Sequence, residues 1–264
     1  MALTGLEGKS AVVTGAAGGI GAAVARRLVD EGARVTLVDL DEAAVQEVAA
    51  GLGGETLAVA ADVSREDGVA DYMERATAAF GKVELLHLNA GYPGRLVELA
   101  DSQVEDFDRV MGVNTRGVYL GLRAGIRAFG ETGGSIVVSA STASSSAAQL
   151  WGAYVGSKHA VLGLMRVAAL ETARRGIRIN AVCPSIVDTA MVRPNEDSVD
   201  PADRTAARAA IANALPIGRY AEPAELAAAV AWLLSDQASY ATGGVFSIDG
   251  GISATSGFGY RPPG

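Results

Sequence analysis

The sequence has very few side chains that could form a disulfide or hold a transition metal. Among its 264 residues, only Cys183 is a cysteine, and only His87 and His159 are histidines. One cysteine cannot form an internal disulfide, and these three residues cannot assemble a zinc-ligand cluster. We therefore expect no metal site and a reducing, cytoplasmic location. His87 stands in an apolar run and is expected to be a core residue.

The sequence also lacks an excess of positive charge and a long apolar run. It has 22 basic and 30 acidic residues, which give a net charge of −8. This charge argues against a general affinity for nucleic-acid phosphates or anionic membranes. The first residues lack the basic head and apolar run of a signal peptide, and no uncharged stretch reaches membrane-spanning length. We expect a protein that acts on small molecules, without a nucleic-acid or membrane partner.

Hydrophobic residues are abundant, at 49% of the chain, and they recur as short strands alternating with longer helices. Runs that predict strands cover 11–13, 35–38, 57–59, 83–88, 135–138, 177–182 and 245–248. Ala- and Leu-rich stretches predict helices at 20–29, 42–50, 66–80, 104–129, 154–173 and 222–234. Strands that are apolar on both faces and separated by helices imply a parallel sheet covered on both sides. The expected fold is α/β, a doubly wound parallel sheet (Rossmann fold) of seven strands in a single domain spanning 1–264.

The alternation lapses after Pro184. A polar stretch that contains Asp and Arg runs to Asn213 without a regular pattern. Long irregular connections inside compact domains are often lids or binding loops, and the alternative is a mobile spacer. We expect a substrate loop at about 185–215.

A glycine-rich turn links the first predicted strand to the first predicted helix. It contains Gly15, Gly19 and Gly21, where the missing Cβ allows a tight bend and the close approach of a pyrophosphate. The helix that follows offers unpaired N–H groups and the positive end of its dipole to that anion. The spacing differs from the common dinucleotide fingerprint, so glycine count alone also allows a plain structural turn.

Asp39, at the end of the next predicted strand, favours a nucleotide site. A carboxylate about twenty residues beyond the glycines can accept hydrogen bonds from the adenosine ribose hydroxyls and repel a 2′-phosphate. Positions 16, 17 and 40 hold no Arg or Lys that could neutralise such a phosphate. The alternative role for Asp39 is a helix N-cap, but Asp41 and Glu42 are available for that role. The sequence therefore predicts NAD, in preference to NADP, as the cofactor.

Two further groups of residues follow predicted strands and extend this site. Asp62 and Val63 follow the third strand, and Asn89, Ala90 and Gly91 follow the fourth. The carboxyl ends of parallel strands meet at one edge of the sheet, where ligands bind in such folds. There, a carboxylate can bond the adenine amino group, and small residues let the chain pass beside the cofactor. Each group alone would be a strand-end turn, so the prediction depends on their sharing one edge.

Tyr154 and Lys158 stand four residues apart in a predicted helix. Residues with this spacing share a helix face, so the Lys ammonium can lie near the Tyr hydroxyl and favour its ionised form. A phenol with a lowered pKa can act as an acid or a base. The same spacing is also common on ordinary amphipathic surfaces, so the pair alone does not identify a site.

Together these residues resemble the short-chain dehydrogenase/reductase family in its compact single-domain form. The resemblance runs from about Lys9 to Gly251. It rests on Thr14-Gly-x-x-x-Gly-x-Gly21, Asn89-Ala90-Gly91, Asn114, Ser141, Tyr154-x-x-x-Lys158, Asn180-x-Val182-x-Pro184, Thr242-Gly243 and Asp249-Gly250-Gly251. Two positions depart from the usual pattern: Ser185 stands where Gly is usual, and Leu88 stands where a second Asn is common.

The resemblance implies a catalytic role for four residues. Tyr154 would be the acid/base that exchanges a proton with the alcohol oxygen. Lys158 would lower its pKa and hold the nicotinamide ribose, together with Tyr154. Ser141 would orient the substrate oxygen, with Ser139 as second choice, and Asn114 would serve a proton relay to solvent. A mid-helix Asn is a poor helix former, which is an independent sign of a special role for Asn114.

The resemblance also implies further cofactor contacts and an assembly. Ile20 would add to the glycine-rich turn, while Pro184, Val187 and Thr189 would contact the nicotinamide end. A homotetramer is implied, paired through the helices at 104–129 and 154–173. The C-terminal residues 258–263 would be either disordered or tucked against a neighbouring subunit.

The predicted activity is NAD-dependent interconversion of a secondary alcohol and a ketone. Substrate-facing residues are expected at Tyr92, Arg95, Gln149, Trp151 and 186–213, with Trp151 either a wall of the substrate site or a core residue. One alternative is a 3-oxoacyl-thioester reductase that uses NADH. The other is a catalytically silent NAD-binding regulatory protein, although that role would not require Tyr154.

Overall fold

The computed structural model describes residues 3–255 and contains one parallel sheet of seven strands in the order β3-β2-β1-β4-β5-β6-β7. The strands are β1 (Ser10–Thr14), β2 (Arg34–Asp39), β3 (Thr56–Ala60), β4 (Val83–Leu88), β5 (Gly134–Ser139), β6 (Ile177–Pro184) and β7 (Val245–Ile248). The strand order reverses between β1 and β4, and such a reversal is where ligands bind in open α/β sheets. The predicted fold is confirmed.

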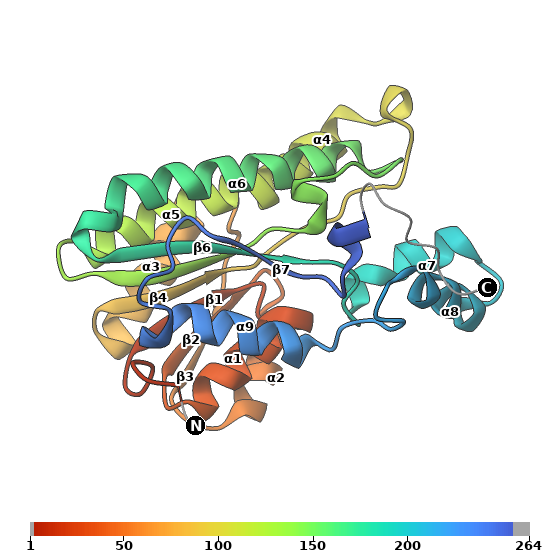
Figure 1. Cartoon of the computed structure of the whole chain (residues 1–264). Coiled ribbons are helices and arrows are strands. Elements are labelled where there is room, and N and C mark those ends of the chain that lie inside the picture. Colours follow the sequence, from red (N-terminus) through yellow and green to blue (C-terminus); the bar gives the residue numbers. More distant parts are fainter. Residues whose placement is uncertain (1–2, 256–264) are drawn as a thin grey trace.

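Helices cover both faces of the sheet (Figure 1). They are α1 (Gly19–Asp30), α2 (Glu42–Leu52), α3 (Glu66–Phe80), α4 (Val104–Met111), α5 (Gly117–Phe129), α6 (Gly152–Thr172), α7 (Arg193–Val199), α8 (Arg204–Ala214) and α9 (Pro223–Leu234). On one face α1 packs against α9, and on the other α5 packs against α3 and α6. Within residues 3–255, no helix combines the length and the hydropathy that crossing a membrane requires.

Two hydrophobic clusters form the core, one on each face of the sheet. In β5, Ile136 and Val138 belong to the cluster beneath α5 and α6, whereas Val137 belongs to the cluster beneath α1 and α9. Successive side chains of a strand point to opposite faces, and both faces of this sheet are covered. The strands therefore read as continuous apolar runs, and His87 in β4 is fully buried among them, as expected.

The sequence indicated an irregular stretch after Pro184, but the structure has two helices there, α7 and α8. The Asp203 side chain accepts a hydrogen bond from the Ala206 N–H and caps α8, whose Ala-rich sequence has high helix propensity. Few residues of these helices are buried, so no continuous apolar stretch marks them in the sequence. In Figure 1 they lie beyond the main layers, at the right of the view.

Salt bridges tie this segment together internally, and one small apolar cluster and a bridge join it to the chain that follows. Arg208 of α8 binds both carboxylate oxygens of Asp188, at 2.8 and 2.5 Å, and stacks on the Tyr220 ring. Val187 forms a parallel bridge with Ala221. Val192, Leu215 and Tyr220 are buried beneath the two helices.

Candidate functional site

A cavity of about 490 Å³ opens at the carboxyl ends of the central strands. One end is bordered by the glycine-rich turn and Asp39, and the other by residues of β5, α6 and α7. The residues that line it are Gly15, Gly18, Gly19, Ile20, Asp39, Asn89, Ala90, Gly91, Ser139, Ala140, Ser141, Thr142, Ala143, Ala148, Trp151, Tyr154, Lys158, Pro184, Ser185, Ile186, Val187, Thr189, Ala190, Met191, Val192, Asn195 and Ile252. Most of the predicted site residues therefore meet in one space.

The glycine-rich turn has the geometry that requires glycine. Gly15 and Gly19 have φ values of +66° and +55°, which L side chains rarely adopt. A Cβ on Gly21 would lie 2.0 Å from the Gly15 carbonyl oxygen. The turn thus folds back tightly onto the start of α1 and leaves a cradle without side chains, which fits a pyrophosphate at the helix N-terminus.

We expect Gly21→Ala to destabilise the protein by at least about 2 kcal/mol, because the backbone of the turn has to move to admit the methyl group. Gly51→Ala is the matched control, since Gly51 also lies in a helix but a Cβ there meets nothing within 4 Å. This control should be neutral or stabilising by up to about 1 kcal/mol. Urea unfolding of both variants measures the difference, and equal free energies of unfolding would contradict the steric explanation.

Asn89 locks the end of β4 to the glycine-rich turn. Its Nδ2 donates to the carbonyl oxygens of Thr14 and Gly15, at 3.1 and 3.3 Å, and its Oδ1 accepts from the Ser139 hydroxyl at 3.0 Å. His87 Nε2 lies 3.0 Å from the same hydroxyl. Burial lowers the pKa of His87 to about 3, so its ring is neutral. Asn89 therefore holds the turn in place. The Ser139 hydroxyl is occupied by its hydrogen bonds with Asn89 and His87.

Asp39 borders the cavity at the end of β2. Its Oδ2 accepts from the Ala17 N–H at 2.9 Å, and its Oδ1 accepts from the Leu40 N–H at 2.8 Å. Asp41, and not Asp39, caps α2 by accepting from the Ala44 N–H. Asp39 is thus held by the glycine-rich turn at the position where a nucleotide ribose can meet it.

Three predicted cofactor residues, Gly21, Asp62 and Val63, do not line the large cavity. Gly21 acts through the close backbone approach described above. The Asp62 carboxylate accepts hydrogen bonds from the Ser64 N–H and hydroxyl, at 2.9 and 2.7 Å, which is the pattern of a strand-end turn. The structure thus leaves Asp62 engaged with its own loop.

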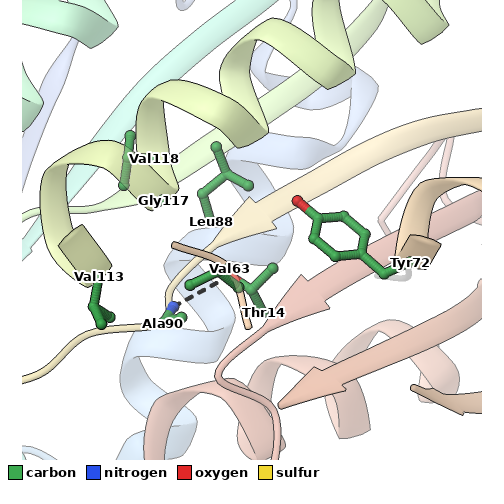
Figure 2. Close-up of a pocket in the computed structure, with 8 residues that line it drawn as sticks. All are labelled: Thr14, Val63, Tyr72, Leu88, Ala90, Val113, Gly117 and Val118. Atoms are coloured by element: carbon green, nitrogen blue, oxygen red, sulfur yellow. Dashed lines mark hydrogen bonds between the residues drawn. The ribbon is translucent and has the colours of Figure 1, made fainter. Parts of the chain in front are cut away.

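Val63 lines a separate small pocket of about 10 Å³, with room for about one water molecule. Figure 2 shows this pocket between Val63, Thr14, Ala90 and the ring of Tyr72, with the Ala90 N–H donating to the Thr14 hydroxyl at 3.2 Å. Thr14 also accepts from the Asn89 N–H at 2.9 Å. The pocket lies beside the β1 and β4 termini but is not part of the large cavity.

Tyr154 and Lys158 both line the large cavity from the first turns of α6. The Lys158 Nζ lies 5.6 Å from the centre of the Tyr154 ring and donates to the Ser139 carbonyl oxygen at 2.8 Å. Burial lowers the pKa of Lys158 to about 8. The pair shares one helix face, as predicted.

The pKa of Tyr154 does not follow the sequence-based expectation. Burial raises it above the ordinary value for a phenol, and a hydrogen bond with Ser141 opposes the rise. Lys158 does not offset the effect of burial: its ammonium donates to the Ser139 carbonyl oxygen and lies 5.6 Å from the centre of the Tyr154 ring. In this polypeptide alone, the phenol is a weaker acid than tyrosine in water.

Ser141 begins a short turn just after β5. Its Oγ accepts from the Ala143 N–H at 3.1 Å, which leaves the hydroxyl hydrogen for the hydrogen bond with the Tyr154 phenol. Ser139, by contrast, donates its hydroxyl hydrogen to Asn89. The geometry therefore favours Ser141 over Ser139 as the group that meets a substrate oxygen.

Asn114 is fully buried in a π-helical turn, Gly112–Arg116, between α4 and α5. Such turns within α-helices are rare and frequent at functional sites. The Asn114 amide is paired on both sides with the Tyr92 backbone, at 2.7 and 3.0 Å, and it also donates to the Ser157 hydroxyl at 3.0 Å. Asn114 therefore fixes the chain after β4 against α6.

Of the residues expected to face a substrate, Trp151 lines the cavity, and its ring meets the Tyr154 ring edge-on at 5.1 Å. Tyr92, Arg95 and Gln149 do not line it. The Tyr92 hydroxyl donates to Asp106 at 3.3 Å, and the Arg95 N–H donates to the same carboxylate at 2.9 Å. The segment after Gly91 is therefore fastened to α4, and Tyr92 and Arg95 are not part of the cavity wall.

Pro184, Val187 and Thr189 line the cavity, as the resemblance implied. Ser185, one of the two departures from the usual pattern, donates its hydroxyl hydrogen to the Asp249 carbonyl oxygen at 2.9 Å. This bond ties the chain after β6 to the chain after β7. Ile252, from the same C-terminal part, also lines the cavity, and the sequence held no signal for its position.

The comparisons with known proteins agree with this geometry. A family model described as enoyl-(acyl carrier protein) reductase matches residues 15–253. The 2,5-dichloro-2,5-cyclohexadiene-1,4-diol dehydrogenase of Sphingobium indicum is 38% identical over 258 residues, which cover 96% of this chain and 100% of that protein. The chain belongs to the short-chain dehydrogenase/reductase family. Its members are oxidoreductases that use a nicotinamide cofactor.

Two solved structures of this family superimpose closely. The crystal structure of levodione reductase has a TM-score of 0.91 and 36% identity, and the match covers 94% of this chain and 99% of that chain. A 3-ketoacyl-(acyl-carrier-protein) reductase from Brucella melitensis, complexed with NADH, has a TM-score of 0.85 and 36% identity, with the same coverage. The short-chain dehydrogenase/reductase fold therefore extends over nearly the whole chain.

Proposed function

We propose that this chain is an NAD-dependent dehydrogenase of secondary alcohols on small apolar rings. The observation that carries the proposal is the single cavity in which Tyr154, Lys158 and Ser141 meet a glycine cradle and Asp39. The absence of a Cβ at Gly15 and Gly19 makes the cradle fit a dinucleotide pyrophosphate. When bound, NAD accepts the hydride from the carbinol carbon.

In this proposal, Tyr154 takes the alcohol proton during oxidation and returns it during reduction. Ser141 donates a hydrogen bond to the substrate oxygen and keeps it next to the phenol. Lys158 contributes positive charge beneath the phenol and contacts the cofactor ribose. Asn114 maintains the π-helical turn, next to which a water can connect Lys158 to solvent.

We propose that Asp39 gives the enzyme its preference for NAD over NADP. Its carboxylate is fixed by the Ala17 and Leu40 N–H groups, so a 2′-phosphate would meet a negative charge that cannot easily move away. We expect Asp39→Ala to reduce the ratio of kcat/KM for NAD over NADP by at least about tenfold, since one repulsive charge pair is removed. Initial rates with each cofactor measure the ratio.

Asp41→Ala is the matched control for this experiment, because Asp41 lies two residues away and caps α2. It should cost about 1 kcal/mol of stability and leave the cofactor ratio unchanged. A ratio that stays unchanged in Asp39→Ala would show that another residue sets the preference.

The proposed substrate class follows from the walls of the cavity around Tyr154. They are mainly apolar and come from Ala143, Ala148, Trp151, Ile186, Met191, Val192 and Ile252. An indole and aliphatic side chains suit a compact hydrocarbon ring. The diol dehydrogenase of Sphingobium indicum, whose named substrate is a six-membered ring, supports this choice.

A screen of cyclic and acyclic secondary alcohols with NAD, followed by NADH absorbance, tests the proposal. We expect cyclohexanol derivatives to react faster than open-chain polyols. A 3-oxoacyl-thioester reductase is the second candidate, favoured by the description of the family model and by the NADH complex from Brucella melitensis. Faster NADH oxidation with an acyl thioester than with cyclohexanone would favour that candidate. The complete Tyr154, Lys158, Ser141 and Asn114 set argues against a silent binding protein.

We further propose that 185–215 acts as a substrate lid and that the chain forms a homotetramer in the cytoplasm. The helices predicted to pair carry exposed apolar side chains, which supports the proposed assembly. They include Phe107, Tyr119, Val167 and Leu170. Sedimentation equilibrium measures the assembly. Residues 258–263, which were predicted to be either disordered or tucked against a neighbouring subunit, lie outside the residues that the structure describes.

A further inference from the structure

One polar side chain of the proposed lid borders the cavity without a partner. The lid also contributes Ser185 and Thr189 to the cavity wall, but the Ser185 hydroxyl is bonded to the Asp249 carbonyl oxygen. The Thr189 side chain lies against Gly19, at the cofactor end. Asn195, from α7, is the lid residue whose side-chain amide forms no hydrogen bond with any part of the chain between residues 3 and 255.

The neighbours of Asn195 do not explain this lack of a partner. Asp197 is paired with Arg204 at 2.8 Å, and Ser198 donates to the Asn195 backbone carbonyl at 2.7 Å. Glu196 is buried, but Arg208 and Arg204 lie 3.7 and 3.9 Å from its carboxylate oxygens. The charged groups around Asn195 are thus ion-paired within the lid, although the Glu196 Oε1 also has no hydrogen bond, whereas the Asn195 amide has neither kind of partner among residues 3–255.

A buried acceptor without a partner is costly. The Asn195 Oδ1 is shielded from solvent, and leaving such an oxygen unbonded typically destabilises a protein by about 1–3 kcal/mol. Asn195 lines the cavity, and a rotation about its Cβ–Cγ bond exchanges the positions of Oδ1 and Nδ2. A ligand that supplies both a hydrogen-bond donor and an acceptor would satisfy the amide.

We propose that Asn195 is a specificity-determining residue that binds a second hydroxyl group of a cyclic diol, the hydroxyl that is not oxidised. This inference rests on the proposed function, because it requires a ring alcohol at Tyr154. A hydroxyl fits the observation better than a carboxylate or a carbonyl, since only the hydroxyl can donate to Oδ1. The apolar walls would hold the ring, and the two polar groups of the substrate would meet Tyr154 and Asn195.

The test compares cyclohexanol with cyclohexane-1,4-diol as substrates of three proteins. These are the wild type, Asn195→Leu, which removes the amide at similar volume, and Asn195→Asp, which keeps the acceptor. We expect the wild type to prefer the diol in kcat/KM by at least about tenfold, and Asn195→Leu to abolish most of this preference, as for one lost hydrogen bond in a closed site. Asn195→Asp should retain part of it. The exposed residue Val199 provides the control on α7, and Val199→Ala should leave the preference unchanged.

Equal kcat/KM values of the wild type for the two alcohols would overturn the inference. A loss in Asn195→Leu that is equal for both alcohols would also overturn it, because it would indicate a purely structural role. Failure of the wild type to oxidise either alcohol would instead contradict the proposed function.

Binding can be measured without turnover, in the NADH complex of Tyr154→Phe. Quenching of NADH fluorescence gives the Kd for cyclohexanone and for 4-hydroxycyclohexanone. We expect the hydroxyketone to bind at least about fivefold more tightly, and to lose this advantage when Asn195→Leu is added. Equal affinities in Tyr154→Phe would count against the role of Asn195, whatever the activity of the wild type.

Discussion

Tyr154→Phe is expected to lower kcat for alcohol oxidation by at least about a hundredfold, the low end for the loss of an acid or base. The phenyl ring can keep the edge-on contact with Trp151 at 5.1 Å, so the cavity should hold its shape. Only the hydroxyl that bonds Ser141 is removed. NAD binding should persist, because the glycine-rich turn and Asp39 are untouched. Steady-state rates and fluorescence titration with NADH measure the two effects separately.

Tyr92→Phe is the matched control for this prediction. It makes the same chemical change at a tyrosine whose hydroxyl binds Asp106 and which does not line the cavity. Its turnover should stay within about threefold of the wild type, as for a surface hydrogen bond. Similar losses in the two variants would remove the special role of Tyr154.

Lys158→Met is expected to lower kcat/KM by at least about a hundredfold, since it removes the positive charge that lies 5.6 Å from the Tyr154 ring and the proposed contact with the cofactor ribose. Methionine keeps the apolar stem in this buried position. Lys82→Met, at an exposed lysine, is the control and should leave the rates unchanged. An active Lys158→Met enzyme with a normal pH profile would contradict the assigned role.

The same variant should change how stability depends on pH. Burial lowers the pKa of Lys158 from 10.5 to about 8, so between these values the unfolded chain binds a proton that the folded chain does not. Lys158 therefore disfavours folding below about pH 8, and this penalty fades as the pH rises toward 10.5. The free energy of unfolding of the wild type, minus that of Lys158→Met, should increase by about 3 kcal/mol over this range. Urea unfolding at several pH values measures it, and a flat difference would contradict the lowered pKa.

The sequence predicted the sheet well because its strands are buried on both faces. Runs such as 136–138 contain no polar residue, and Ala- and Leu-rich stretches mark the helices between the strands. The sequence did not predict the helices α7 and α8, because they are mostly exposed. They bury only a few side chains, among them Ala207 and Glu196, and are held by ion pairs between residues such as Asp188 and Arg208. Pairs distant in sequence leave no periodic signal.

The meeting of Tyr154, Lys158 and Ser141 with the glycine-rich turn at one cavity was predictable, because strand ends and helix faces bring these residues together. The residues after Gly91 were not, because the contact of Tyr92 and Arg95 with Asp106 depends on how α4 packs. Asp62 accepts both hydrogen bonds from Ser64 of its own loop at Oδ1, and its contact with the cofactor stays a prediction. Local hydrogen bonding of this kind competes with a ligand role and is not visible from spacing alone.

The pKa of Tyr154 shows a further limit of reasoning from spacing. Residues four apart on a helix share a face, but the long Lys158 side chain can choose among several acceptors. Here it donates to the Ser139 carbonyl oxygen, at 2.8 Å. Burial is then the largest influence on the pKa of the Tyr154 phenol, and it raises that pKa. Lowering the pKa of Tyr154 therefore requires charge that the polypeptide alone does not place at its oxygen.

The central claim is that hydride passes from a ring alcohol to NAD in the cavity that contains Tyr154. Cyclohexanol deuterated at its carbinol carbon tests it most directly, with the mass of the NADH produced as the readout. The account predicts NADH that carries one deuterium in the wild type, and at least about a hundredfold less of it in Tyr154→Phe. Formation of unlabelled NADH, or equal labelled yields from the two proteins at early times, would contradict it.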